Sequence, residues 1–278
     1  MTDQEEFYNE ILADMENGTL VLPTLPEVAL KVREVVDDPD TTAAEVSEII
    51  VTDAALSARL LKVANSPLYR GRVSIDSIQM AVSRLGQVLV KNLVTSLVME
   101  QMFQATSNRL EKRLHDLWEH SMEVSAICQV LAAKQAGIKK DEAMLAGLIH
   151  DIGKLPILMK AEDKPELLSN TVALDAVLTN LHTRVGAAIL ESWGFPEALI
   201  AVTAEHENLE RNSASPDLVD IVQVANLQSH INTEQALSPE ALDAVPAFAK
   251  LGVDTNVNLV ELDENSEEYA EAMALFGF

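Results

Sequence analysis

The residues best suited to chemistry in this chain of 278 residues are His150 and Asp151, which are adjacent in an otherwise apolar helical run. An imidazole and a carboxylate are good ligands for a divalent cation, and the Lys154 ammonium would suit a phosphate oxygen if the protein were an enzyme. Adjacent residues of a helix point about 100° apart, so the pair can converge on one ion only where the helix ends. Gly153 and Pro156 predict such a break.

A site needs ligands from elsewhere, and the other histidines lie on or beside helices that hydrophobic spacing predicts. These are helices over about 108–136 with His115 and His120, over about 172–193 with His182, from Pro196 to His206, and from Pro216 through Asn226. Two acidic helices, starting at Ser238 and Asp254, follow them. A lone histidine on an apolar helix is more often a core residue than a ligand, and we interpret His115 and His230 in that way.

The first half of the chain consists of short amphipathic segments. Periodic apolar residues and helix caps predict helices over about 2–16, 28–36, 42–50, 54–64, 78–85 and 88–103. We therefore predict an all-α fold of two packed helical lobes, residues 1–104 and residues 105–278. The connection 105–109 is too short to act as a free linker, so the lobes should depend on each other.

Cysteine content and the absence of long apolar runs bear on the location of the protein. The single Cys128 excludes an intrachain disulfide and is typical of a reducing compartment. The sequence opens without the basic and then apolar pattern of a secretion signal, and it has no run of about 18 apolar residues. We expect a soluble, cytoplasmic protein.

The net charge of −24 disfavours nucleic acid and anionic membranes as partners, because both bind basic surfaces. The charge is uneven, however, and one segment is basic with Asp76 as its only acid. Its basic residues are Arg59, Lys62, Arg70, Arg72, Arg84 and Lys91. Such a segment is usually a solvated face. The alternative is a surface that binds an acidic partner.

Four sequence blocks in the first half carry a family resemblance. They are Leu22-Pro23-Thr24-Leu25-Pro26-Glu27-Val28, Ile50-Val51-Thr52-Asp53, Leu60-Leu61-Lys62-Val63-Ala64-Asn65-Ser66 and Ala81-Val82-Ser83-Arg84-Leu85-Gly86. In this order and spacing they resemble the HDOD family of bacterial signalling domains, over about residues 20–230. Ala54 stands where the family usually has a proline. The resemblance implies a non-catalytic module that binds a protein partner or a small ligand.

The second half resembles the helical fold of the wider HD superfamily of metal-dependent phosphohydrolases and phosphodiesterases. The ligands of that superfamily are a histidine, a His-Asp pair and a later aspartate. They correspond to His120, to His150 with Asp151, and to Asn226. An amide carries no negative charge, so the resemblance implies at most a weakly bound divalent metal here. We expect Asn226→Asp to strengthen binding.

Two more histidines, His182 and His206, resemble the additional ligands of the HD-GYP enzymes, which are two-metal phosphodiesterases of cyclic dinucleotides. That group has a second histidine where this chain has Glu207, and its Gly-Tyr-Pro signature is absent. The retained residues are therefore either metal ligands or an inherited cluster of hydrogen-bonded polar side chains.

Two classes of function remain. The HDOD blocks and Asn226 favour a non-catalytic regulatory module with a protein partner in a signalling pathway and with no certain cofactor. The run from His150 to Lys154 favours a metal-dependent phosphohydrolase or cyclic-dinucleotide phosphodiesterase, in which Lys154 would steady the phosphate. We favour the module.

Overall fold

The computed structural model describes residues 3–104, 108–231, 233, 235–261 and 263–275. Every regular element within these ranges is a helix, which confirms the all-α prediction. None of the helices described there is both long enough and apolar enough to cross a membrane. The elements before residue 104 are α1 (Asp3–Glu16), α2 (Glu27–Val36), α3 (Ala43–Ile50), α4 (Ala54–Ala64), α5 (Ile78–Leu85), α6 (Gln87–Met99) and the 3-10 helix η1 (Glu100–Phe103).

The later elements contain the histidine-bearing helices that the sequence predicts. They are α7 (Glu111–Ala133), α8 (Lys140–Ile149), α9 (Lys154–Ala161), α10 (Pro165–Ser169), α11 (Thr171–Ser192), α12 (Glu197–Glu205), α13 (Leu218–Ser229), α14 (Pro239–Asp243), α15 (Pro246–Leu251), the 3-10 helix η2 (Leu259–Glu261) and α16 (Asp263–Ala274).

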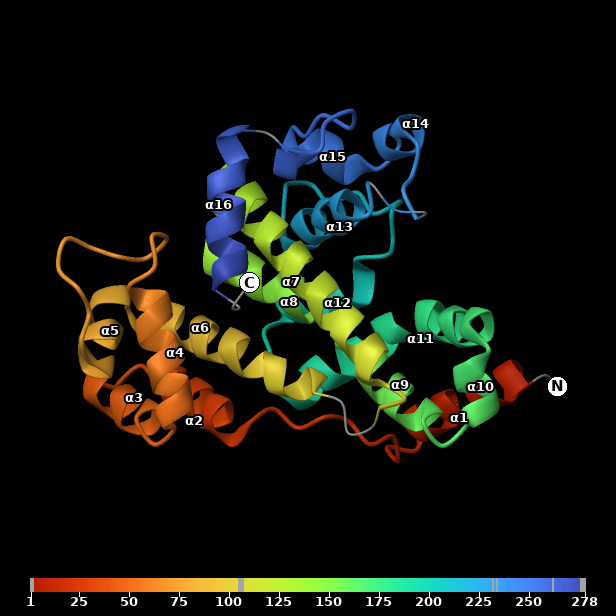
Figure 1. Cartoon of the computed structure of the whole chain (residues 1–278), viewed down its shortest axis with the longest axis horizontal. Coiled ribbons are helices and arrows are strands. Elements are labelled where there is room, and N and C mark those ends of the chain that lie inside the picture. The colour runs from red at the N-terminus through yellow and green to blue at the C-terminus, as the bar shows by residue number, and fades with distance from the viewer. Residues whose placement is uncertain (1–2, 105–107, 232, 234, 262, 276–278) are drawn as a thin grey trace.

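Helices α2 to α6 pack together as one group, at the lower left of Figure 1. Side-chain caps mark the starts of three of these helices, whereas α2 and α6 have none. Thr42 and Glu45 form a capping box at the start of α3, and the side chains of Asp53 and Ser77 cap α4 and α5. The helix starts predicted for this region are thereby confirmed.

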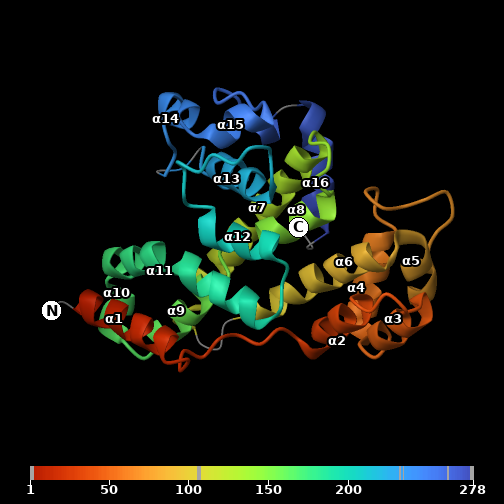
Figure 2. The same cartoon turned by 180° about the vertical axis from the view of Figure 1, so that it is seen from behind.

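The centre of the remaining chain is the packed pair α7 and α8 (Figure 1). Helices α13 and α16 pack against α7, and α6 of the first group packs against α8. Figure 2 shows α9 to α11 on one side of this pair and α13 to α16 on the other. Helix α1 lies with α11, and Lys160 of α9 forms ion pairs with its residues Glu10 and Asp14.

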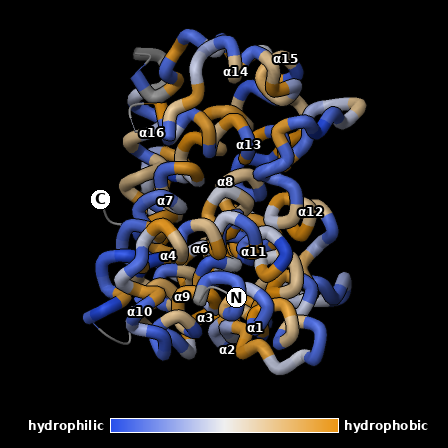
Figure 3. Tube along the Cα trace, turned by 90° about the vertical axis from the view of Figure 1, so that its right-hand side faces the viewer, coloured by the Kyte–Doolittle hydropathy of each residue, from blue (hydrophilic) through white to orange (hydrophobic). Residues whose placement is uncertain are grey.

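One continuous cluster of buried apolar residues runs from Phe7 to Leu275 through both groups. Hydrophobic and hydrophilic residues alternate around most helices (Figure 3), as expected when each helix buries one face. The buried guanidinium of Arg33 crosses between the groups, where it donates a hydrogen bond of 3.0 Å to the carbonyl of Gly194 and lies 3.8 Å from the centre of the Phe195 ring. The groups therefore share their core. The predicted boundary between 104 and 105 stays a prediction, and residues 105–107 lie outside the described residues.

One detail of the predicted helices is wrong. Asp254 does not start a helix, because its carboxylate accepts a hydrogen bond of 2.9 Å from the Asn256 amide in a turn, and α16 begins later. Pro156, which with Gly153 predicted the break after α8, lies in the first turn of α9. Proline is tolerated there because the first N–H groups of a helix have no partner within it.

Candidate metal centre

His150 and Asp151 lie in a short turn, because α8 ends at Ile149 and α9 begins at Lys154. The predicted helix end at this pair is therefore confirmed. Both side chains are almost completely removed from solvent, with 0% and 1% of their surface exposed. A charged carboxylate at that depth is costly unless nearby groups compensate it.

Two glycines let neighbouring helices approach this turn. A Cβ atom at Gly153 would overlap the carbonyl oxygen of His182 and lie 2.5 Å from the amide nitrogen of Gly186, so only glycine fits against α11 here. A Cβ atom at Gly147 would lie 2.7 Å from Cα of Ser125 in α7. These close approaches bring α7 and α11 to the two sides of the turn.

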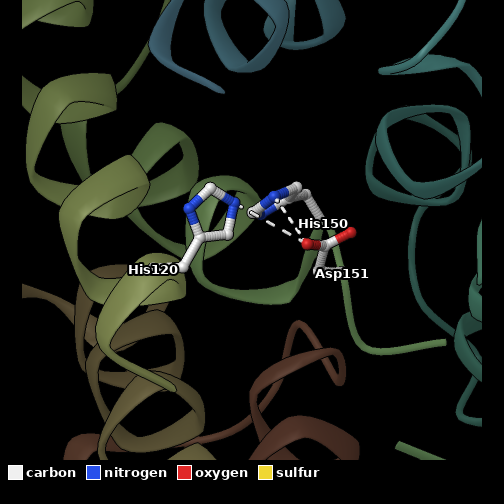
Figure 4. A group of neighbouring side chains, drawn as sticks. All are labelled: His120, His150 and Asp151. Atoms are coloured by element: carbon white, nitrogen blue, oxygen red, sulfur yellow. Dashed lines mark ion pairs between the residues drawn. The ribbon is translucent and has the colours of Figure 1, made fainter. Parts of the chain in front are cut away.

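His120 from α7 joins the pair to form what we call the first triad (Figure 4). Its Nε2 lies 3.7 Å from Oδ2 of Asp151, and Nε2 of His150 lies 3.4 Å from the same oxygen. The candidate ligand atoms of the three residues lie within 4.8 Å of one another. Residues far apart in the sequence thus converge as the family resemblance implies.

His182 of α11 and His206, which follows α12, form the second triad with the same Asp151. Their Nε2 atoms lie 3.3 and 3.6 Å from Oδ1 of Asp151. Asp151 therefore offers one oxygen to each triad. Oε1 of Glu207 lies 3.9 and 3.7 Å from the Nε2 atoms of His182 and His206. The only sign in the sequence that Glu207 belongs to the site is its position beside His206.

Backbone carbonyls fix the tautomers of three of these imidazoles. Each Nδ1 donates to a carbonyl one helical turn earlier, His150 to Gly147 at 2.7 Å, His182 to Leu178 at 2.8 Å and His206 to Val202 at 3.0 Å. Since a carbonyl only accepts, Nδ1 carries the proton and Nε2 of the neutral ring presents a lone pair. The Nε2 atoms of His182 and His206 are 3.2 Å apart, where two lone pairs cannot bond each other.

A proton shared between the Nε2 atoms of His182 and His206 is unfavourable at neutral pH. Burial lowers the pKa of His182 to about 4 and the pKa of His120 to about 3. Burial by itself would raise the pKa of Asp151, but the Lys154 ammonium holds it well below its usual range. Neutral imidazoles around an ionised carboxylate are the protonation states that metal coordination requires.

The two triads differ in charge. Lys154 donates a hydrogen bond to Oδ2 of Asp151, the oxygen that faces the first triad, and so partly neutralises it. No comparable cation contacts Oδ1 among the described residues, and Glu207 lies on that side. The Lys154 ammonium, predicted to suit a phosphate, is bound to the protein's own carboxylate in this structure.

Asn226, where the superfamily has an aspartate, lies in α13 with its buried Oδ1 making no hydrogen bond. One turn later, the ring of His230 stacks on His120 with centroids 5.1 Å apart, so this face of α13 is directed toward the first triad. His230 is therefore a neighbour of the site. His115, expected in the core, is instead 59% exposed beside Glu119.

The donor set fits a divalent cation. Nε2 of His150 and Oδ1 of Asp151 are buried and make no hydrogen bond, and each such group costs about 1–3 kcal/mol when it is left unsatisfied. A cation at the second triad would satisfy Oδ1 of Asp151, and a cation at the first triad would satisfy Nε2 of His150. Imidazole nitrogens in this number favour a transition metal such as zinc or iron over magnesium or calcium.

Comparison with known proteins supports both halves of the resemblance. The model of the HDOD domain matches residues 22–209. A solved structure from Shewanella amazonensis SB2B, named provisionally as a metal-dependent phosphohydrolase, is 32% identical with a TM-score of 0.87, and the match covers 99% of this chain and 100% of that one.

Two curated relatives match parts of longer proteins. An uncharacterized protein of Treponema pallidum is 27% identical over 221 residues, which are 74% of this chain and 42% of that protein. Ribonuclease Y of Oleidesulfovibrio alaskensis is 32% identical over 109 residues, 39% of this chain and 17% of that enzyme. The chain thus spans less than half the length of these relatives.

Proposed function

The chain belongs to the HDOD domain family, and from this premise we propose that it is a regulatory module of a signal-transduction pathway that catalyses no hydrolysis. We further propose that the second triad and Glu207 hold one divalent cation, which stabilises the lobe around it. The observation that carries both statements is the unequal environment of the two Asp151 oxygens.

Charge favours a cation at the second triad over the first. The second triad offers two neutral imidazoles, Oδ1 of Asp151 and a nearby second carboxylate from Glu207. The first triad offers two imidazoles and an oxygen already bound to Lys154, with an amide at Asn226 where a carboxylate would stand. A hard or borderline cation depends strongly on ligand charge. The weak binding expected from the sequence therefore applies to the first triad.

A single cation in a closed site is unsuited to phosphodiester cleavage. Two-metal hydrolysis uses both ions to stabilise the attacking and the leaving oxygen. Catalytic metal sites also keep a position open for water or substrate, whereas structural sites are closed. Three of the proposed ligands, Asp151, His182 and His206, are each at most 1% exposed, which is typical of a closed site, and the half-exposed Glu207 forms its outer edge.

The alternative is a metal-dependent phosphohydrolase, and one observation favours it. Four imidazoles converge on a shared carboxylate, an arrangement that could hold two metals if Lys154 moved from Asp151 to a phosphate. The names of the Shewanella protein and of ribonuclease Y belong to the same class of chemistry.

Hydrolysis separates the two functions. Wild type and His150→Ala are incubated with Mn²⁺ or Zn²⁺ and either bis(p-nitrophenyl) phosphate or a cyclic dinucleotide, and product is followed over time. The regulatory function predicts the same background rate for both proteins. Metal-dependent cleavage by wild type that His150→Ala abolishes would establish the phosphohydrolase instead.

A further inference from the structure

We propose that the loop between α4 and α5 is a preformed docking site for an acidic segment of a partner protein. We call residues 66–74 the basic loop, because Arg70 and Arg72 lie in its middle, which we call its tip, and Arg84 of α5 donates a hydrogen bond to its backbone. The proposal rests on the regulatory function proposed above, which requires a partner. Figure 1 shows this loop extending from the α4 and α5 end of the molecule.

The side chain of Asn65 closes the base of the basic loop. Its Nδ2 donates to the carbonyls of Leu61 at 2.9 Å and Ile75 at 2.8 Å. Its Oδ1 accepts from the amide of Ile75 at 2.8 Å and from the hydroxyl of Ser74 at 3.1 Å. A single amide therefore joins the start of the loop to its end, which is how compact surface loops hold a fixed shape.

Further contacts support the loop from within. Arg84 donates from Nη1 to the carbonyl of Val73, and a Cβ atom at Gly71 would lie 3.6 Å from that same nitrogen. The partly buried Leu68 and Tyr69 pack against the main core at the other side of the loop. The loop is thus fixed at its base and along its length before any partner arrives, which lowers the entropic cost of binding.

The tip of the loop presents binding groups that the protein itself does not use. Arg70 and Arg72 are exposed, and among the described residues neither has an ion-pair or hydrogen-bond partner for its side chain. Between them and the base, Val73 is 63% exposed. Arginine is enriched among the residues that dominate protein interfaces, and its planar guanidinium binds carboxylates through two parallel hydrogen bonds.

The chemistry of the tip indicates an acidic protein segment as its occupant. Two free guanidinium groups beside an apolar side chain match carboxylates that flank an apolar residue. Nucleic acid fits less well, because its affinity depends on many phosphate contacts and this protein carries a net charge of −24. The surrounding negative charge repels an acidic segment at long range, so the attraction acts only within about a Debye length of the loop, where the two guanidinium groups dominate.

The probe is a short fluorescent peptide rich in Asp and Glu around one leucine, and anisotropy is measured at low and at moderate salt. We expect binding by wild type that weakens with salt. The double variant Arg70→Glu/Arg72→Glu should lose about tenfold or more in affinity at low salt. The matched control Arg109→Glu/Lys112→Glu, with the same change of charge on exposed residues near the start of α7, should bind as wild type does.

A third variant tests the fixed shape of the loop. Asn65→Ala leaves every charge in place but removes the four hydrogen bonds at the base, so it should bind the peptide more weakly than wild type. Equal binding by wild type and Arg70→Glu/Arg72→Glu, or equal losses in both charge-reversal variants, would overturn the proposal.

Two other occupants are tested with the same proteins. Tighter binding of a single-stranded oligonucleotide of the same charge as the peptide would overturn the proposal in favour of nucleic acid. A concentration-dependent dimer that disappears in Arg70→Glu/Arg72→Glu would overturn it in favour of a second copy of this chain. Phosphodiester hydrolysis by these variants reports separately on the regulatory function, because turnover would refute that function whether or not the peptide binds.

Discussion

Replacing Gly153 with alanine tests whether close packing of the central turn positions the second triad. Gly153 has φ −65° and ψ −16°, which alanine adopts readily, so any penalty must come from contacts. The new Cβ would overlap the carbonyl oxygen of His182 and lie 2.5 Å from the Gly186 nitrogen, and such contacts need about 3.0 Å. The overlap with the oxygen is the deeper of the two, so the turn and α11 must separate by at least about 1 Å. Overpacking typically costs about 1–3 kcal/mol, and we expect the upper end or more because backbone must move.

The separation would also move His182 away from Oδ1 of Asp151, so Gly153→Ala should bind Zn²⁺ more weakly than wild type. Urea unfolding and calorimetric titration measure the two effects. Gly186→Ala, whose Cβ would lie 3.2 Å from Cβ of Thr203, should show a smaller loss of stability, and Gly71→Ala should be close to neutral. If Gly153→Ala matches Gly71→Ala in both assays, the close approach of turn and helix does not position the site. Should Gly153→Ala fail to fold, Gly186→Ala compared with Gly71→Ala decides the question.

Three further predictions concern other residues. Burial raises the pKa of Glu123, which lies near Tyr269 of α16. The stabilising contribution of Glu123 is therefore present below its unfolded pKa of about 4.3 and is lost as pH rises through its folded pKa. Glu123→Gln should unfold at higher urea than wild type near pH 7 but not near pH 4, and an equal difference at both pH values would contradict this. Asn226→Asp should add a second Zn²⁺ site by calorimetry, with at least about 10-fold tighter binding at the first triad, and unchanged stoichiometry would contradict the charge argument. His150→Ala and Asp151→Ala should each lower the free energy of unfolding by about 1–3 kcal/mol without removing a catalytic activity, and loss of a measurable turnover would refute that.

Local signals in the sequence predicted the helices and the helix break that contains the His-Asp pair. The capping box of Thr42 and Glu45 and the cap at Asp53 each depend on a few neighbouring residues, and the structure contains both. Asp254 was misjudged because an aspartate can cap a helix or close a turn equally well, and packing far along the chain decides which. Only the family resemblance predicted that His120 lies beside His150 and Asp151, because no rule of helical spacing relates residues so far apart in the sequence.

The inequality of the two triads could not be predicted from the sequence. It depends on which Asp151 oxygen the Lys154 ammonium contacts, and on the side of the turn to which Glu207 belongs. Both are consequences of tertiary packing. Likewise, His115 is exposed because the neighbouring helices cover another face of α7. The apolar residues along α7 do not by themselves tell which face will be covered.

The position of the bound metal tests the account most directly. Crystals of the wild-type protein grown with Zn²⁺, measured at the zinc absorption edge, would give an anomalous-difference map that locates every zinc ion. We predict one strong peak per chain, between His182, His206 and Asp151, with Glu207 turned toward it. A peak between His120 and His150, two peaks of equal height, or no peak at either triad would contradict the assignment of a single cation to the second triad.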